Sequence, residues 1–185
     1  MTIFEHIKNR RSVYPHQFSD KKIDDVDIRK LLDMANWAPT HRKTEPWRFK
    51  VISGEFKYKA GEFFKDVYTQ TTEKPKSFKA KKIAEKFEKS SHVIAVCMQR
   101  DPKESVPEWE EIAATAMAVQ NMWLAAKTLK IGLYWSTPAF KDHLNELIPL
   151  DISETCLGFL YLGYFDEDLE LLERNTSIEE KTVWY

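Results

Sequence analysis

Glycine is scarce in this chain of 185 residues, and its scarcity excludes two common kinds of nucleotide site. The five glycines are Gly54, Gly61, Gly132, Gly158 and Gly163. Neither G-x-G-x-x-G nor G-x-x-x-x-G-K-[ST] can be assembled from them, which rules out a Rossmann fingerprint and a Walker loop. Any nucleotide bound by this protein would therefore be held by cationic side chains and hydroxyl groups.

Cysteine and histidine are also sparse. Cys97 and Cys156 both lie in apolar runs and are too few for a disulfide framework, so we expect two buried thiols. The five histidines are scattered, and no H-E-x-x-H, C-x-x-C or G-x-S-x-G motif occurs. The sequence therefore offers no support for a metal site or a serine triad, and it indicates no catalytic acid or base.

Long apolar runs and a large net charge are missing as well. No stretch approaches the roughly 18–20 apolar residues of a membrane span. The N-terminus lacks the apolar core of a signal peptide, so we expect a cytoplasmic protein without a membrane partner. The formal net charge of −1 gives no global reason to expect a nucleic-acid partner.

Residues 73–89 are locally basic, with seven lysines. This segment could be a nucleic-acid-binding face or a solvated face of a helix. Glu73, Glu85 and Glu88 interleave with the lysines, which favours the solvated helix.

The pattern of apolar residues predicts a single α+β domain over residues 1–185. Thr2 and Glu5 form a capping box that should begin a short helix, and Asp24 should begin a second. Strands are expected at 47–51, 93–98, 131–135 and 156–164, alternating with helical stripes. Thr137 and Pro138 are expected to be the N-cap and first residue of a further helix.

The longest predicted helix, residues 108–129, is apolar on nearly all sides after its first turn. Such a helix must be covered all round, either by the rest of this chain or by a second subunit, and the short chain favours a second subunit. The chain also ends in Val183, Trp184 and Tyr185. We expect this apolar end to dock on its own sheet edge or on that of a partner.

Three segments carry groups suited to an anionic, flat cofactor. Arg10-Arg11-Ser12 offers two guanidinium groups and a hydroxyl for a phosphate. The loop 39–49 places His41, Arg42 and Lys43 between two prolines. Segment 132–138 runs from a strand with Tyr134 and Trp135 into the expected start of a helix, where N–H groups favour negative charge. Each segment taken alone has a simpler explanation. These are surface charge for Arg10-Arg11-Ser12, a polar turn for the loop 39–49, and core packing for Tyr134 and Trp135.

Together these segments resemble the nitroreductase family of flavoproteins. The R-R-S start, the pattern A-P-T-H-x-x-x-E-P-W-R-F at 38–49, the alanine-rich helix and the strand G-F-L-Y-L-G-Y at 158–164 occur in family order. The tail, in which Arg174 precedes residues 179–184, fits as well. The resemblance covers essentially the whole chain and is closest to the short members of the family.

The resemblance implies an α/β sandwich with a central antiparallel-rich sheet, forming a homodimer through long helices and an exchanged C-terminal extension, residues 165–185. Two FMN molecules would lie at the subunit interface. The residues that the resemblance assigns to FMN binding are Arg10, Arg11, Ser12, His41, Lys43, Tyr134, Trp135, Ser136 and Arg174. His41 and Lys43 would be presented by the other subunit, and Arg174 would bind the phosphate.

This chain departs from many relatives at two places. Lys43 and Glu45 stand where asparagine and glutamine are common, and 135–137 replaces a turn that usually contains glycine. These differences bear on substrate fit and on hydrogen bonds to the flavin edge.

The activity that the resemblance implies is hydride transfer from NAD(P)H to FMN, followed by reduction of a nitroaromatic or quinone-like acceptor in a ping-pong cycle. Three other functions stay open: a different flavin reaction on the same scaffold, such as dehalogenation or metabolite oxidation; a flavin-binding or redox-sensing protein without turnover; and a nucleic-acid module using residues 73–89.

Overall fold

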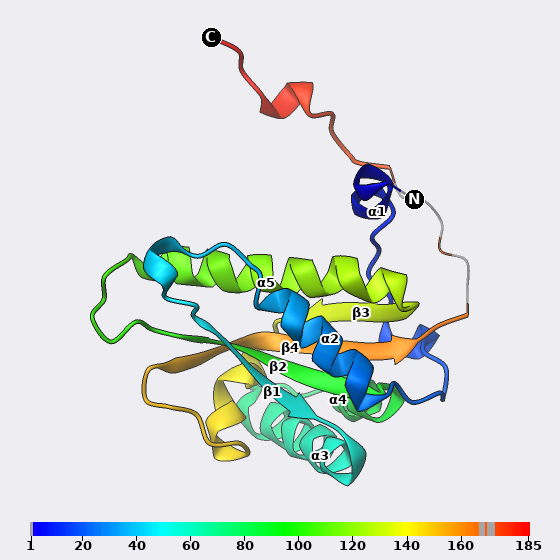
Figure 1. The fold of residues 1–185 in the computed structure, drawn as a ribbon. Coiled ribbons are helices and arrows are strands. Elements are labelled where there is room, and N and C mark those ends of the chain that lie inside the picture. The colour runs from blue at the N-terminus through cyan, green and yellow to red at the C-terminus, as the bar shows by residue number, and fades with distance from the viewer. Residues whose placement is uncertain (1, 167–168, 170–172) are drawn as a thin grey trace.

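The computed structural model describes residues 2–166, 169 and 173–185, so residues 167, 168 and 170–172 of the expected C-terminal extension lie outside the described part. Two α-helices precede the first strand, and helices separate each strand from the next (Figure 1). The α-helices are α1 (Ile3–Lys8), α2 (Asp25–Ala35), α3 (Gly54–Thr71), α4 (Ser77–Lys89) and α5 (Glu108–Thr128). Shorter 3-10 helices are η1 (Pro15–Gln17), η2 (His41–Lys43), η3 (Ala139–Glu146) and η4 (Glu179–Lys181).

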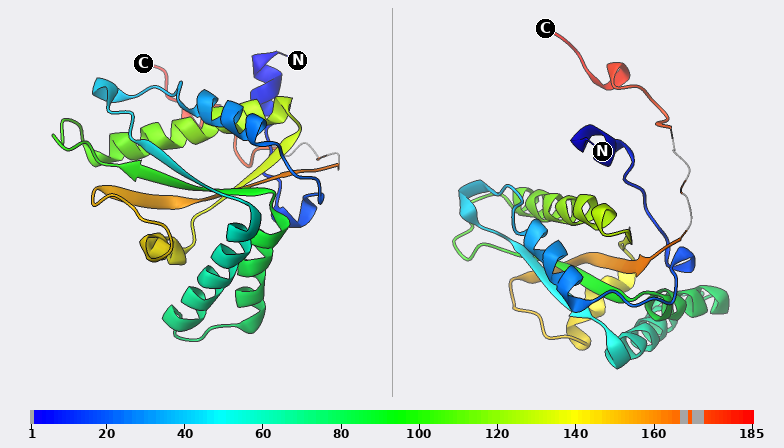
Figure 2. Two further views of the ribbon diagram at one scale, coloured as in Figure 1. Left: turned by 60° about the horizontal axis from the view of Figure 1, so that its bottom comes forward. Right: turned by 45° about the vertical axis from the view of Figure 1, so that its right-hand side comes forward.

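The four strands form one antiparallel sheet, which confirms the expected fold class. They are β1 (Trp47–Ile52), β2 (His92–Gln99), β3 (Ile131–Ser136) and β4 (Glu154–Tyr164), in the order β1-β2-β4-β3. The apolar runs of β2 and β4 occupy the two central positions. Figures 1 and 2 show α2 and α5 on one face of the sheet, and α3, α4 and η3 on the other.

Each face of the sheet has its own apolar core, because alternate side chains of a strand point to opposite sides. Ile94, Val96 and Leu160 pack against α2 and α5. Val93, Ala95, Cys97, Phe159 and Tyr161 pack against α3, α4 and η3. Both cysteines are buried free thiols, as expected.

Local signals set several helix starts. The side chain of Thr2 accepts a hydrogen bond from Glu5 N at 3.3 Å, and the Glu5 carboxylate accepts one from Thr2 N at 2.6 Å, so the predicted capping box is present. The prediction for Thr137 and Pro138 is wrong. Pro138 has extended dihedrals and is itself the N-cap, and the segment that follows is the 3-10 helix η3.

Glycine is required where β3 meets its neighbours. Gly158 has φ of +149° and pairs with Val96, and Cys97 then pairs with Cys156, so β4 has a bulge at Leu157. A Cβ atom at this position would lie 2.5 Å from Ser136 O and 2.8 Å from Trp135 Nε1. Side chains other than hydrogen would therefore push the end of β3 away from β4.

The other edge of β3 receives the N-terminal segment. Val13 N donates to Leu133 O at 3.0 Å. A Cβ atom on Gly132 would come within 2.7 Å of Val13 Cβ, so glycine permits this close approach. The segment that follows α1 is thereby held along the sheet edge.

The C-terminal segment projects away from the sheet and its helices, passing near α1 (Figures 1 and 2). Val183, Trp184 and Tyr185 are 72%, 91% and 114% exposed in the single chain. No helix among the described residues is both long and apolar enough to cross a membrane.

The aromatic core under the sheet provides a test of the fold. Phe64 is fully buried, with ring centroids of Phe87, Phe140 and Phe159 at 5.5, 5.2 and 4.9 Å. Phe64→Ala should lower the free energy of unfolding by about 3–5 kcal/mol, because it leaves a cavity. Urea unfolding followed by circular dichroism measures this change. Phe78→Ala, at an exposed position of α4, is the control; equal losses in both variants would contradict the packing described.

Candidate functional site

The segment Arg10-Arg11-Ser12 is anchored on the C-terminal half of α5. The Arg10 guanidinium lies over the Trp123 ring, 4.7 Å from its centroid. Trp123 Nε1 donates to Arg11 O at 3.0 Å, and Arg11 Nη1 donates to Lys8 O and Arg10 O, both at 2.8 Å. Ser12 follows directly, between this anchor and the pairing of Val13 with β3. The segment therefore has a fixed place at the junction of α5 and β3.

Four cationic side chains from distant parts of the sequence gather here. Burial lowers the pKa of Arg10, and the positive charges of Arg174 and Arg11 lower it further. Burial also lowers the pKa of Lys127, near the end of α5, with a further contribution from Arg11. We call Arg10, Arg11, Lys127 and Arg174 the cation group. Among the described residues, the neighbouring charges that act on Arg10 and Lys127 are positive, so an anion bound here would relieve their repulsion.

Tyr134, Trp135 and Ser136 lie at the end of β3, on alternating faces. Tyr134 packs against Tyr14 and Tyr161, with centroids at 4.6 and 6.2 Å, on the side of α4. Trp135 packs on the opposite face, against the core beside α5. Its Nε1 atom is buried and has no hydrogen-bond partner among the described residues. A buried donor of this kind costs free energy unless a partner satisfies it.

Lys86 of α4 belongs to this region, although nothing in its local sequence singled it out. Its Nζ lies 5.4 Å from the centroid of the Tyr134 ring. Burial lowers its pKa first, and the charge of Lys82 second. The available signal was its position three residues after Ile83 and next to Phe87, at the border of the apolar stripe of α4. The many lysines at 73–89 favour the interpretation as a solvated helix face, and within such a face Lys86 does not stand out.

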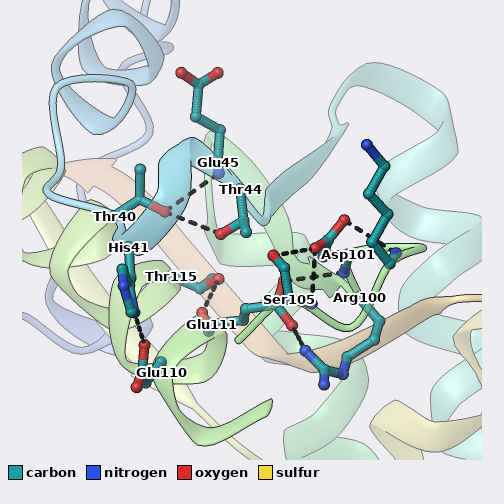
Figure 3. A network of polar contacts seen from close by, with 11 residues as sticks. Thr40, His41, Thr44, Glu45, Arg100, Asp101, Ser105, Glu110, Glu111 and Thr115 are labelled. Atoms are coloured by element: carbon teal, nitrogen blue, oxygen red, sulfur yellow. Dashed lines mark hydrogen bonds and ion pairs between the residues drawn. The ribbon is translucent and has the colours of Figure 1, made fainter. Parts of the chain in front are cut away.

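His41 and Lys43 lie elsewhere, near the N-terminal end of α5. His41 Nδ1 is 2.6 Å from Glu110 Oε2 in the first turn of α5 (Figure 3). Glu110 and Trp123 are about 20 Å apart along the helix axis, at 1.5 Å per residue. Within one chain the structure therefore does not bring His41 and Lys43 to the cation group.

The loop that carries His41 has a defined and strained shape. Arg42, Lys43 and Glu45 have φ of 51°, 57° and 43°, which is uncommon for residues other than glycine. The Thr40 hydroxyl lies 3.0 Å from that of Thr44 and accepts a hydrogen bond from Glu45 N at 3.3 Å (Figure 3). Strain that the surrounding contacts maintain is typical of binding loops.

A buried carboxylate supports the same end of α5. Glu111 accepts a hydrogen bond from Asp101 N at 2.9 Å and pairs with Arg100 (Figure 3). Asp101 in turn accepts hydrogen bonds from Ser105 N and the Ser105 hydroxyl, and these lower its pKa. The loop between β2 and α5 is thereby fastened to the helix that contacts His41.

The arrangement thus has two separate parts in one chain. One end of α5 carries the cation group beside the aromatic end of β3, and the other end carries the loop with His41. The first part suits a phosphate and a flat ring, because it combines charge-assisted donors with aromatic surface.

Comparison with known proteins gives consistent matches along the chain. The model of the "Nitroreductase family" matches residues 7–164. YfhC of Bacillus subtilis (strain 168), provisionally named an NAD(P)H nitroreductase, is 28% identical over 183 residues, which cover 95% of this chain and 90% of YfhC.

Solved structures are similar over the same range. A nitroreductase-like family protein from Bacillus cereus has a TM-score of 0.84 and 30% identity, covering 100% of this chain and 96% of that one. A protein from Desulfovibrio desulfuricans, solved in complex with FMN, has a TM-score of 0.73 and 22% identity, covering 100% and 97%.

Proposed function

The chain belongs to the nitroreductase family, and from this membership we propose that it is an FMN-dependent oxidoreductase that takes hydride from NAD(P)H and reduces nitroaromatic or quinone-like acceptors. The observation that carries the proposal is the cation group. It combines Arg10 and Arg11 from the N-terminal part of the chain with Arg174 from the C-terminal part, beside the aromatic end of β3. A supply of NAD(P)H fits the expected cytoplasmic location.

The residues present fit an FMN phosphate. Arg10, Arg11 and Arg174 can make bidentate, charge-assisted hydrogen bonds, and Ser12 adds a hydroxyl donor. Lys127 contributes charge at the same place. FMN is present in the solved relative from Desulfovibrio desulfuricans, which supports FMN as the cofactor.

The end of β3 fits the ring of FMN. Tyr134, Trp135 and Ser136 would lie beside the ring. The Nε1 atom of Trp135, which has no partner among the described residues, is a donor that a polar ring edge could satisfy. Lys86 adds a partly buried positive charge next to Tyr134, where it would favour negative charge on the ring.

The proposal includes a homodimer with FMN at the subunit interface. His41 and Lys43 lie at the far end of α5 from the cation group, so they could reach the same cofactor only from a second subunit. Apolar side chains are exposed on α1 and α5, including Phe4, Trp109 and Ile112. A partner subunit would cover them, and the extension 165–185 would dock on that partner.

FMN, when bound, would supply two-electron redox chemistry between NAD(P)H and the acceptor. The overall reaction is NAD(P)H + H⁺ + quinone → NAD(P)⁺ + hydroquinone, or ArNO2 + NAD(P)H + H⁺ → ArNO + NAD(P)⁺ + H2O for a nitro group. The protein's part is to hold the cofactor, to place positive charge beside it and to limit access by water. No side chain is assigned as a general acid or base.

The cation group gives the first test of the proposal. Arg10→Ala and Arg174→Ala should each weaken FMN binding about ten-fold to over a hundred-fold, because each removes a hydrogen bond between charged groups. Titration of the apoprotein followed by quenching of flavin fluorescence measures the affinity. Arg29→Ala, which removes an exposed cation of α2, is the matched control. Parent-like affinity in both test variants would show the phosphate assignment to be wrong.

The tail gives the second test. Deleting Val183–Tyr185 keeps Arg174 but removes the apolar end, so the variant should dissociate to monomers at higher protein concentration than the parent. Light scattering over a dilution series measures this change. A mass of one 21.8 kDa chain for the intact protein with FMN still bound would refute an interface-bound cofactor.

Kinetics give the third test. Donor and acceptor would use the same face of the ring and could not stack there together, so double-reciprocal plots at several acceptor concentrations should be parallel. Broad acceptor use is expected, because stacking on a flat surface discriminates weakly. Anaerobic mixing with excess NADH and NADPH is the decisive control: flavin that stays oxidised would favour a flavin-binding protein without turnover.

A further inference from the structure

Four lysines of α4 follow one face of the helix. They are Lys79, Lys82, Lys86 and Lys89, at spacings of three and four residues. Two hollows border this face, with volumes of about 400 and 310 Å³, and Lys82 and Lys86 belong to the walls of both. The lysines of this face are therefore accessible to solvent and also border two hollows.

The larger hollow has walls suited to a small aromatic anion. Lys79, Lys82 and Lys86 form one wall, and Tyr68 and Phe140 provide aromatic surface on others. No carboxylate belongs to its described lining. Its volume lies within the range of about 300–1,000 Å³ that is usual for small-molecule sites. We call it the lysine hollow.

The positive charge of the lysine hollow is not neutralised by the described part of the chain. None of Lys79, Lys82 and Lys86 forms an ion pair with a described carboxylate, whereas Lys81, which does not line this hollow, pairs with Glu85 at 3.6 Å. Burial lowers the pKa of Lys86, and the positive charge of Lys82 lowers it further, so Lys82 and Lys86 repel each other. A ligand carboxylate would relieve this repulsion.

The lysine hollow adjoins the end of β3. Lys86, in its wall, lies over Tyr134, and Pro138, in the opposite wall, follows two residues after the last residue of β3. If FMN is held as proposed above, a ligand in the hollow can extend its reducible group towards the flavin ring.

We propose that the lysine hollow binds the carboxylate of an aromatic electron acceptor, with Lys82 and Lys79 as its specificity-determining residues. This inference rests on the proposed function and adds to it a substrate class, aromatic carboxylates. The phosphates of NADPH suit the hollow less well, because riboses and a pyrophosphate separate the 2′-phosphate from the nicotinamide. A carboxylate carried directly on the acceptor ring stays close to the reducible group.

The test compares two acceptors that differ in charge. 4-Nitrobenzoate and 4-nitrobenzamide share the ring and the nitro group, but only the benzoate is anionic at neutral pH. In the FMN-loaded parent, the benzoate should have the lower KM. Lys82→Ala should raise the KM for 4-nitrobenzoate about ten-fold, and leave that for 4-nitrobenzamide within about two-fold of the parent. Lys82→Arg should restore much of the preference.

Lys81→Ala is the matched control, since Lys81 has the same charge and lies on the same helix, but it lines a different hollow and pairs with Glu85. It should change neither KM. Lys79→Ala should act in the same direction as Lys82→Ala. All these lysines are solvent-exposed, so the variants should keep the parent's circular dichroism and thermal unfolding.

A second measurement does not depend on turnover. Titration calorimetry of benzoate into the FMN-bound protein should show binding that Lys82→Ala weakens about ten-fold and Lys81→Ala leaves unchanged. If NAD(P)H fails to reduce the flavin, the proposed function fails, while this titration still tests the hollow.

Two results would overturn the inference. One is an unchanged ratio of the two KM values together with unchanged benzoate affinity in Lys82→Ala. The other is a raised KM for NADPH relative to NADH in Lys82→Ala with 4-nitrobenzoate unaffected, which would assign the lysines to a phosphate of the electron donor instead.

Discussion

Burial of β2 and β4 on both faces is the constraint from which the rest of the architecture follows. Val93 to Met98 and Phe159 to Leu162 are almost wholly inaccessible to solvent. Neither face of these strands can meet water, so helices must cover both sides of the sheet. The helices α2 and α5 cover one face, and α3, α4 and η3 cover the other. The edge strand β3 pairs with the N-terminal segment. The cation group lies beside the aromatic end of β3 at this edge.

Repulsion within the cation group and exposed apolar surface on α1 and α5 both raise the free energy of the single chain. Each is unfavourable for an isolated chain, and each would be relieved by a binding partner, an anion for the charges and a second subunit for the apolar side chains. Conflicts between local rules of stability and an observed structure are expected at functional sites. Trp135 Nε1 is buried and has no hydrogen-bond partner in the described part of the chain, so it is unfavourable for the same reason.

Much of the fold was predictable because its signals are local. The capping box of Thr2 and Glu5, the apolar run of β2 and the long helix at 108–128 appear in the structure where the pattern places them. The true N-cap of η3 could not be predicted from the sequence. Pro138 adopts extended dihedrals, and its ring permits these as readily as helical ones. For the site, Arg10 and Arg174 could be paired only through the family resemblance, since nothing local relates residues at opposite chain ends.

The sequence by itself determined the alternation of elements, the absence of a glycine-rich nucleotide loop and the residue types available to bind an anion and a flat ring. Tertiary structure decided which of these residues meet. It brought Arg174 to Arg10, set Lys86 over Tyr134, and left His41 at the far end of α5. The reason is physical: periodicity records which side of an element is buried, whereas proximity between elements depends on how the sheet and helices pack, and that information is spread over the whole chain.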